Sequence, residues 1–223
     1  MRRAFLLAVL APLALVAQSQ SQSQSMEIVL ERNEAGAWKT IDPGLVLKSG
    51  DLLRFRFRAT FDGYLYVINS GTSGGQSLLF PADNTGRNNR VEAGREYLVP
   101  ATGASFQVAG PAGHDVVYWL ISPVPLDGNP AAALNSNRAP RPAGKLIPRC
   151  DQSIFRARGL CIDSSAGPRN VADPAALPDA ISTSAPNLQA RELVIVQDKN
   201  RSRVSSSGKL TGPIVYEFRL AHS

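Results

Sequence analysis

The stretch GDLLRFRFRATFDGYLYVINSG, residues 50–71, alternates apolar and charged side chains and then meets an Asp-Gly pair. Successive side chains of a β-strand point to opposite faces, so its apolar residues share one face and its arginines share the other. The apolar face holds Leu53, Phe55, Phe57 and Ala59, and the arginine face holds Arg54, Arg56 and Arg58. This pattern predicts a half-buried strand whose apolar face contributes to a core.

The pair Asp62-Gly63 predicts a tight hairpin that returns the chain along the arginine strand. A two-residue loop would leave Leu65 and Val67 on the arginine face, whereas a three-residue loop would turn both side chains inward. The sequence does not choose between these two registers.

The arginine row has two interpretations. As a binding site, Arg54, Arg56 and Arg58 would present their guanidinium groups to a carboxylate or phosphate ligand. As a solvated face, their stems would cover apolar neighbours and their charged ends would meet acidic side chains of adjacent strands. Residues 26–123 carry nine Lys and Arg against ten Asp and Glu, and this balance favours the solvated face.

The N-terminus has the pattern of an export signal. Arg2 and Arg3 precede an apolar run that ends at Ala17 and is too short to span a bilayer. We therefore expect residues 1–17 to be a signal peptide and the polar repeat at residues 18–25 to be a disordered leader. The mature chain is expected to be exported to the periplasm or the extracellular space, without insertion into the membrane.

Residues 26–123 predict the core of an all-β domain. Short segments rich in β-branched and aromatic residues alternate there with turn signals, which is the rhythm of an antiparallel β-sandwich, immunoglobulin-like or jelly-roll-like. The expected strands are residues 27–31, 37–41, 52–60, 64–68, 77–80, 96–99, 105–108 and 116–121.

Residues 124–190 are rich in Pro and Ala and poor in aromatic residues, so we expect a long irregular extension that buries little surface. Order should return in residues 191–223, where segments 192–197 and 212–220 would form a final hairpin that completes the sandwich. Residues 124–223 carry thirteen Lys and Arg against eight Asp and Glu. A polyanion partner is one interpretation of this excess, but a solvated basic linker is favoured, and no nucleic acid is expected.

Cys150 and Cys161 are the two cysteines of the chain. In an exported protein they are expected to form one disulfide, which would close a short loop within the extension. The chain-entropy treatment assigns such a loop a stabilisation of about 3 kcal/mol.

Residues Gly71 to Gly75 match the G-x-S-x-G pattern of serine hydrolases, with Ser73 at the centre, and His114 is followed by Asp115. A nucleophile elbow requires a helix directly after the serine, yet the next residues predict a strand. Neighbours on a strand also face opposite ways, so His114 and Asp115 do not easily orient one another. A serine hydrolase is therefore the least favoured function. No catalytic residue, metal site or cofactor is predicted.

Tyr118 and Trp119 are neighbours on one expected strand, so at most one of them faces inward. The other would be a surface aromatic ring with a polar group, a combination suited to binding a sugar. This pair supports a glycan or small-ligand site as the alternative function.

Several motifs resemble the bacterial family catalogued as domain of unknown function 4384. They are Gly50-Asp51 before the arginine strand, the run Asp62-Gly63-Tyr64-Leu65-Tyr66-Val67, Leu79-Phe80-Pro81, Ala93-Gly94, Tyr97 with Pro100, and Phe106. The resemblance covers residues 37–123 and implies an exported or envelope β-sandwich with an accessory role. It carries over no catalytic residue.

The expected function is that of a non-catalytic exported module that binds another protein of the cell envelope. Exposed strand edges, or the arginine face together with the basic extension, would form the contact. A module that binds a glycan or a small ligand is the alternative.

Overall fold

The computed structural model describes residues 24–126, 147–171, 177–178, 181–182, 185, 188, 193–198, 200–206, 208 and 212–223. The predicted signal peptide and most of the predicted leader lie outside these residues. The last leader residue, Ser25, is already the first residue of strand β1 (Ser25–Glu34). No helix in the described part of the chain is long and apolar enough to cross a membrane.

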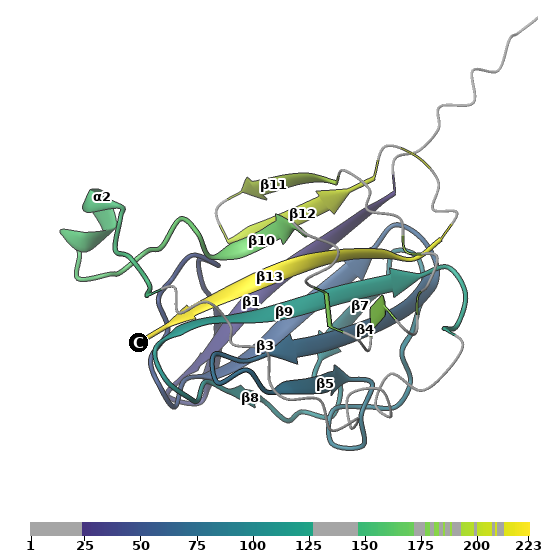
Figure 1. The fold of residues 1–223 in the computed structure, drawn as a ribbon, viewed down its shortest axis with the longest axis horizontal. Coiled ribbons are helices and arrows are strands. Elements are labelled where there is room, and N and C mark those ends of the chain that lie inside the picture. The colour runs from purple at the N-terminus through teal and green to yellow at the C-terminus, as the bar shows by residue number, and fades with distance from the viewer. Residues whose placement is uncertain are drawn as a thin grey trace, which may run out of the picture.

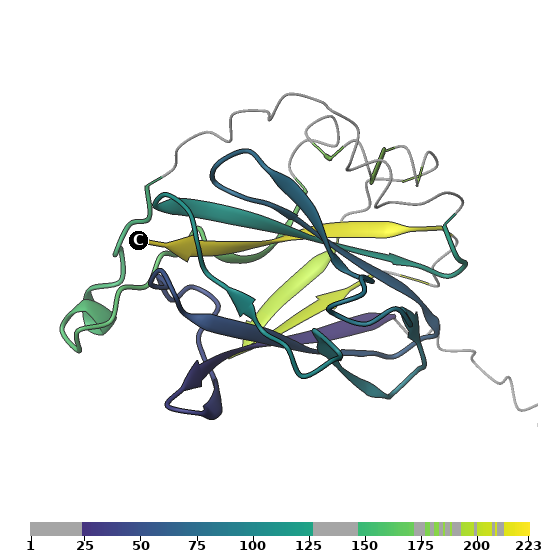
Figure 2. The ribbon, with the colours of Figure 1, turned by 90° about the horizontal axis from the view of Figure 1, so that it is seen from below.

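The strands form two antiparallel sheets that pack face to face, so the predicted antiparallel β-sandwich is confirmed (Figure 1, Figure 2). The first sheet has the order β11-β12-β1-β3-β7, and the second has the order β10-β13-β9-β4-β5. Strands β2 and β8 join the first sheet beside β1 and β3, and β6 joins the second beside β4. A short helix, α2 (Ser153–Arg156), lies outside both layers.

The bounds of the strands follow the predicted segments closely. In the first sheet they are β2 (Ala37–Thr40), β3 (Leu52–Ala59), β7 (Glu96–Val99), β8 (Phe106–Gln107), β11 (Val194–Asp198) and β12 (Arg201–Ser205). In the second they are β4 (Gly63–Ser70), β5 (Gln76–Phe80), β6 (Arg90–Val91), β9 (Gly113–Ser122), β10 (Gly167–Asn170) and β13 (Ile214–His222). Strands β6, β10 and β12 were not predicted.

Aromatic rings from both sheets meet in the core between the layers. Trp119 of β9 is fully buried, and its ring lies 5.2 Å from that of Phe55 and 5.6 Å from that of Phe57, both on β3. Tyr216 of β13 stacks on the other side at 6.4 Å. The apolar face of the arginine strand is therefore the core face, as its alternation predicts.

Asp62 and Gly63 do not form the predicted hairpin. Strand β3 belongs to the first sheet and β4 to the second, so the chain crosses between the layers at this point. Gly63 fits close to the neighbouring strand, where an added Cβ would lie 2.9 Å from the backbone oxygen of Ser122. Because the strands face one another across the core, Leu65 and Val67 both point inward and are buried. Neither of the two expected hairpin registers applies.

The expected terminal hairpin is also wrong in its pairing. Strand β11 pairs with the unpredicted strand β12 in the first sheet, and β13 pairs with β9 and β10 in the second. Strand β12 escapes prediction because its inward positions are Ser202 and Val204, which give a weak apolar alternation. The C-terminal segment therefore completes both layers.

The extension buries more surface than its composition predicts. Leu177, Ile181 and Ala185 are all buried, and the first two pack against the outer face of the second sheet. They form a second apolar cluster with Tyr66 and Tyr118. Part of the extension is thus a cover for the sandwich, and strand β10 is a further ordered part of it.

Candidate functional site

The arginine row neutralises a buried acid. Glu31 of β1 is only 4% exposed, and its two carboxylate oxygens lie 2.6 Å from Nε of Arg54 and 3.0 Å from Nε of Arg56. The Arg54 guanidinium also lies 4.4 Å above the ring of Trp38. Two of the three predicted binding arginines are therefore occupied by groups of this chain.

Arg58 differs from the other two arginines because it makes no ion pair among the residues that the structure describes. Its neighbour across the strand pair, Glu27, is shared by Arg201 at 3.4 Å and Arg203 at 3.8 Å, both from β12. On the outer face of the first sheet, four arginines thus meet two acids of strand β1. This arrangement matches the interpretation that the sequence favours.

The residues of the suspected hydrolase motif serve other contacts. Asp115 accepts a hydrogen bond from the backbone N–H of Thr72 at 2.9 Å, next to Ser73. His114 instead faces Asp163, with Nε2 3.0 Å from the carboxylate. Adjacent residues of β9 thus point apart, as the strand geometry requires.

A buried cluster of polar groups forms around Asp163. Its carboxylate accepts hydrogen bonds from the Ser165 hydroxyl at 2.6 Å and from the backbone N–H of Arg149 at 2.9 Å. The Ser165 hydroxyl lies 3.2 Å from Nε2 of His114, the same nitrogen that faces Asp163. A catalytic relay uses opposite nitrogens of the ring, so this cluster has the wrong geometry for nucleophilic catalysis.

Asp163 holds three segments together and is stabilised as an anion. Burial favours the neutral acid and raises the pKa of Asp163, but the opposing contributions are larger in sum. Hydrogen bonds from Ser165 and from the N–H of Arg149, with the nearby His114, hold the pKa below its ordinary value. The carboxylate thereby ties strand β9 and the loop before Cys150 to the turn at residues 163–165.

The aromatic pair on β9 offers no surface platform, so the expectation of an exposed ring is wrong. Trp119 lies in the core between the sheets and is completely buried. Tyr118 lies on the outer face of the second sheet but is only 8% exposed, because the apolar cluster that contains Ile181 covers that face. Burial, followed by the charge of Glu217, raises the pKa of Tyr118 to about 12.

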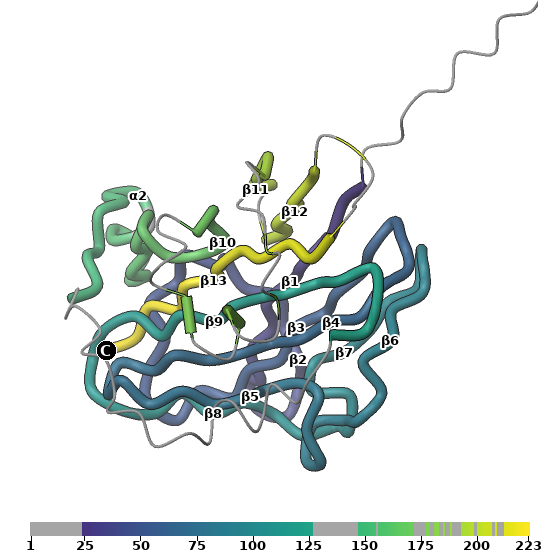
Figure 3. Tube along the Cα trace, turned by 45° about the vertical axis from the view of Figure 1, so that its right-hand side comes forward, coloured from purple at the N-terminus to yellow at the C-terminus, as the bar shows by residue number. Residues whose placement is uncertain are grey.

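The predicted disulfide between Cys150 and Cys161 is present. It closes a loop that contains α2 and projects from the end of the sandwich (Figure 3). Arg156, Arg158 and Ile154 are exposed on this loop. The loop is joined to the sandwich by the contacts of Asp163.

A cavity of about 660 Å³ lies where the edge strands of the two sheets meet, beside β10 and β11. Asn170 of β10 is one of its lining residues, and its side chain donates to the Leu193 carbonyl at 3.0 Å and accepts from the Leu193 N–H at 3.2 Å. The turn at Pro43 and Gly44 also lines the cavity, together with Ser164. No sequence pattern predicts this site, because its lining comes from segments far apart in the chain and β10 falls within the predicted irregular extension.

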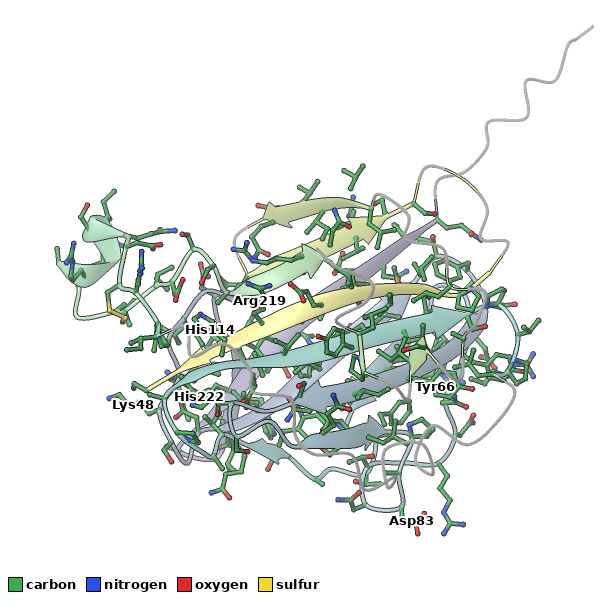
Figure 4. The ribbon with its side chains drawn as sticks, viewed as in Figure 1. Lys48, Tyr66, Asp83, His114, Arg219 and His222 are labelled. Atoms are coloured by element: carbon green, nitrogen blue, oxygen red, sulfur yellow. A yellow bond between two sulfur atoms is a disulfide. The ribbon has the colours of Figure 1, made fainter. Side chains whose placement is uncertain are left out.

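Charged side chains line this cavity. Arg219 of β13 donates to Glu217 at 2.6 Å, which forms an internal ion pair (Figure 4). Arg169 of β10 donates to the Ser164 carbonyl at 2.5 Å. Asp42 accepts the backbone N–H of Gly44 at 2.8 Å. Within the described residues neither Arg169 nor Asp42 has an oppositely charged group within 4.0 Å.

The free edge of β11 is the second candidate surface. Strand β12 pairs with one side of β11, and within the described residues no strand pairs with the other side. Val194 and Val196 on this strand are 60% and 52% exposed. Natural edge strands are commonly protected by charges, by Pro or by a covering segment, so two exposed valines there are unusual.

No group of metal-binding side chains is found in the described ranges. Asp83, in the loop after Pro81, is instead paired with Arg87 at 2.8 Å. The loop is therefore organised by its own ion pair.

Comparison with known proteins gives one match. The profile of a family described as Domain of unknown function (DUF4384) matches residues 46–125, and the chain carries that domain there. The predicted resemblance is confirmed, over slightly different bounds. The matched residues include strands β3 to β9, so both sheets are completed by strands outside the match. A search of curated proteins and a search of solved structures each gave no significant match.

Proposed function

We propose that this protein is a non-catalytic, exported β-sandwich module that binds an extended segment of another protein of the bacterial cell envelope. The proposed contact is the free edge of β11. The observation that supports it is the exposure of Val194 and Val196 on an edge strand that nothing in the described residues covers.

A strand of the partner added at this edge would provide hydrogen-bond partners for the backbone and would cover the exposed apolar side chains. Backbone groups on the side of β11 that faces away from β12 would bond to the backbone of the partner, as in β-strand addition. Val194 and Val196 share the outer face of the strand, so alternate apolar side chains of the partner would pack against them.

The arginine row is a weaker candidate for the contact. Arg54 and Arg56 are held by Glu31, and using them for a partner would leave that buried carboxylate without its cations. Arg58 has no such commitment, but it is a single exposed side chain. The edge of β11 therefore supports the proposal better.

The test places a photoactivatable cross-linking residue at Val196, with a matched position at Arg87 as the control. Arg87 is strongly exposed and lies in the same loop as Asp83, at the opposite end of the sandwich from β11 (Figure 4). Cross-linking in envelope extract, read by mass spectrometry, should give a protein adduct at position 196 that is absent at position 87. The substitution Val194→Lys should abolish that adduct, because a lysine on the edge opposes strand addition.

Three results would count against the proposal. They are an adduct at both positions, an adduct that survives Val194→Lys, or no protein adduct at position 196. An adduct with a second copy of this chain would assign the edge to self-association instead.

A further inference from the structure

We propose that the cavity beside β10 and β11 binds a small zwitterion, an α-amino acid or a short peptide. Arg169 would hold its carboxylate and Asp42 would hold its ammonium group. This inference rests on other observations than the proposed protein contact, although Ile195 and Gln197 of β11 line the cavity. It rests on two opposite charges that line one cavity and, within the described residues, lack oppositely charged partners.

The volume and position of the cavity suit a small ligand. A space of about 660 Å³ falls within the usual range of about 300–1,000 Å³ for sites of this kind. Its walls come from both sheets and from the turn at residues 42–44, so the side chains that line it are fixed by the fold. It also lies between two sheet edges, where backbone hydrogen-bonding groups are available.

Arg169 supplies the positive charge. Its guanidinium donates to the Ser164 carbonyl, while its Nε is buried and has no partner in the described part of the chain. The guanidinium is therefore partly desolvated but not neutralised. A carboxylate is the group that best complements it, because one planar fork of donors matches the two carboxylate oxygens.

Asp42 supplies the negative charge. One of its oxygens accepts the Gly44 N–H, and among the residues that the structure describes no cation lies within 4.0 Å of the carboxylate. The other charged pair in the cavity, Arg219 with Glu217, is already matched at 2.6 Å. A ligand with both an anionic and a cationic group would thus neutralise the two remaining charges at once.

Other ligand classes fit the charges less well. A phosphate dianion would meet the carboxylates of Asp42 and Glu217 as well as the arginines. A neutral sugar would desolvate Arg169 and Asp42 further without neutralising either of them. The side chain of Asn170, which also lines the cavity, already binds the backbone N–H and C=O of one residue, Leu193. Peptide-like groups therefore fit the space between the two edges.

The test measures binding of defined probes by calorimetry and by the shift in melting temperature. The zwitterionic probes are glycine, alanine, glutamate and the dipeptide Ala-Ala, and the single-charge probes are acetate, ethylammonium and inorganic phosphate. N-acetylglucosamine is the neutral probe. At least one zwitterion should bind saturably and raise the melting temperature, while the other probes should bind about tenfold or more weakly.

Two conservative variants assign the charges. Arg169→Gln keeps a donor for the Ser164 carbonyl, and Asp42→Asn keeps an acceptor for the Gly44 N–H. Each should weaken zwitterion binding about tenfold or more without lowering the melting temperature of the free protein by more than a few degrees. Arg203→Gln, on the outer face of the first sheet, is the matched control and should bind normally.

The proposal is overturned if acetate or phosphate binds as tightly as the zwitterions, with dependence on Arg169 but not on Asp42. It is also overturned if N-acetylglucosamine binds best, or if no probe gives a saturable signal up to about 10 mM, a limit that corresponds to very weak binding. The cross-link at position 196 should survive Arg169→Gln. If no zwitterion binds while the cross-link at position 196 forms, only this inference fails. If a zwitterion binds while the cross-link does not form, only the proposed protein contact fails.

Discussion

The carboxylate of Glu31 lies 2.6 Å from Nε of Arg54, across the pairing of strands β1 and β3. Arg56 closes on the other oxygen of the same carboxylate. Glu31 is almost inaccessible to water, so its charge is stabilised by these two arginines rather than by solvent. One buried acid on the neighbouring strand thus accounts for two of the three alternating arginines, Arg54 and Arg56.

The substitution Glu31→Gln should destabilise the fold by about 1–3 kcal/mol, because it removes the partner of two partly buried guanidinium groups. Urea unfolding followed by tryptophan fluorescence would measure the loss. The control is Arg58→Ser on the same face, which should change stability by no more than about 0.5 kcal/mol. Equal losses of unfolding free energy for the two variants would show that the ion pairs of Glu31 do not stabilise the fold.

The substitution Asp163→Asn should also lower stability at neutral pH. An amide cannot accept hydrogen bonds through both of its terminal atoms, so one of the contacts to Ser165, Arg149 or His114 is lost. The expected loss in urea unfolding is about 1–3 kcal/mol. The control is Asp151→Asn, whose contact with Ser164 is exposed, and it should lower the free energy of unfolding less than Asp163→Asn does.

The effect of Asp163 should depend on pH with a defined sign. Its folded pKa is lowered, so its contribution is fully present above the unfolded value of about 3.9 and is lost as the pH falls through the folded value. The stability difference between native protein and Asp163→Asn should therefore be constant above about pH 5 and should shrink below about pH 4. A difference that grows on acidification would contradict the assignment.

The layers of the fold follow from local patterns, whereas the pairing of strands does not. The alternation around Phe55 and Phe57 predicts a strand and its core face correctly. The Asp62-Gly63 pair predicts a turn, but a turn signal does not say whether the next strand pairs with the last or crosses to the other layer. That choice is made by distant residues, since β3 pairs with β1 and β7, and β4 with β9.

The candidate sites show the same limit. The arginines of β3 are visible in the sequence, but their partner Glu31 is set by register across two strands. The cavity beside β10 joins Asp42 to Arg169, and no spacing links residues so far apart. Tyr118 is absent from the surface because the extension, although poor in aromatic residues, supplies Ile181 as a cover. Trp119 is absent from the surface because it lies in the core between the sheets. Short sequence patterns therefore predict the strands and their buried faces, but they do not predict which side chains meet at the edges of the sheets.

Removal of the disulfide should weaken the loop that carries α2. The double substitution Cys150→Ser with Cys161→Ser opens a short loop, and the chain-entropy treatment gives an upper estimate of about 3 kcal/mol for the loss. Thermal unfolding of the variant, beside native protein with and without a reducing agent, would measure it. Reduced native protein should match the variant. A variant as stable as oxidised native protein would show that the contacts of Asp163 and the backbone hydrogen bonds at Cys161 and Asp163 hold the loop without the disulfide.

The cover on the second sheet can be tested through one side chain. Ile181 is fully buried against Tyr66 and Tyr118, so Ile181→Ala should cost about 2–4 kcal/mol in urea unfolding. The matched control is Ile154→Ala on α2, where the side chain is 69% exposed and the loss of unfolding free energy should stay within about 0.5 kcal/mol.

The variant Ile181→Ala has a second readout, the pKa of Tyr118. Because burial is the main cause that raises the pKa of Tyr118 to about 12, loosening the cover should move that pKa toward its ordinary value of about 10. A titration of phenolate absorbance would show the change, and an unchanged titration together with unchanged stability would mean that Ile181 does not cover Tyr118.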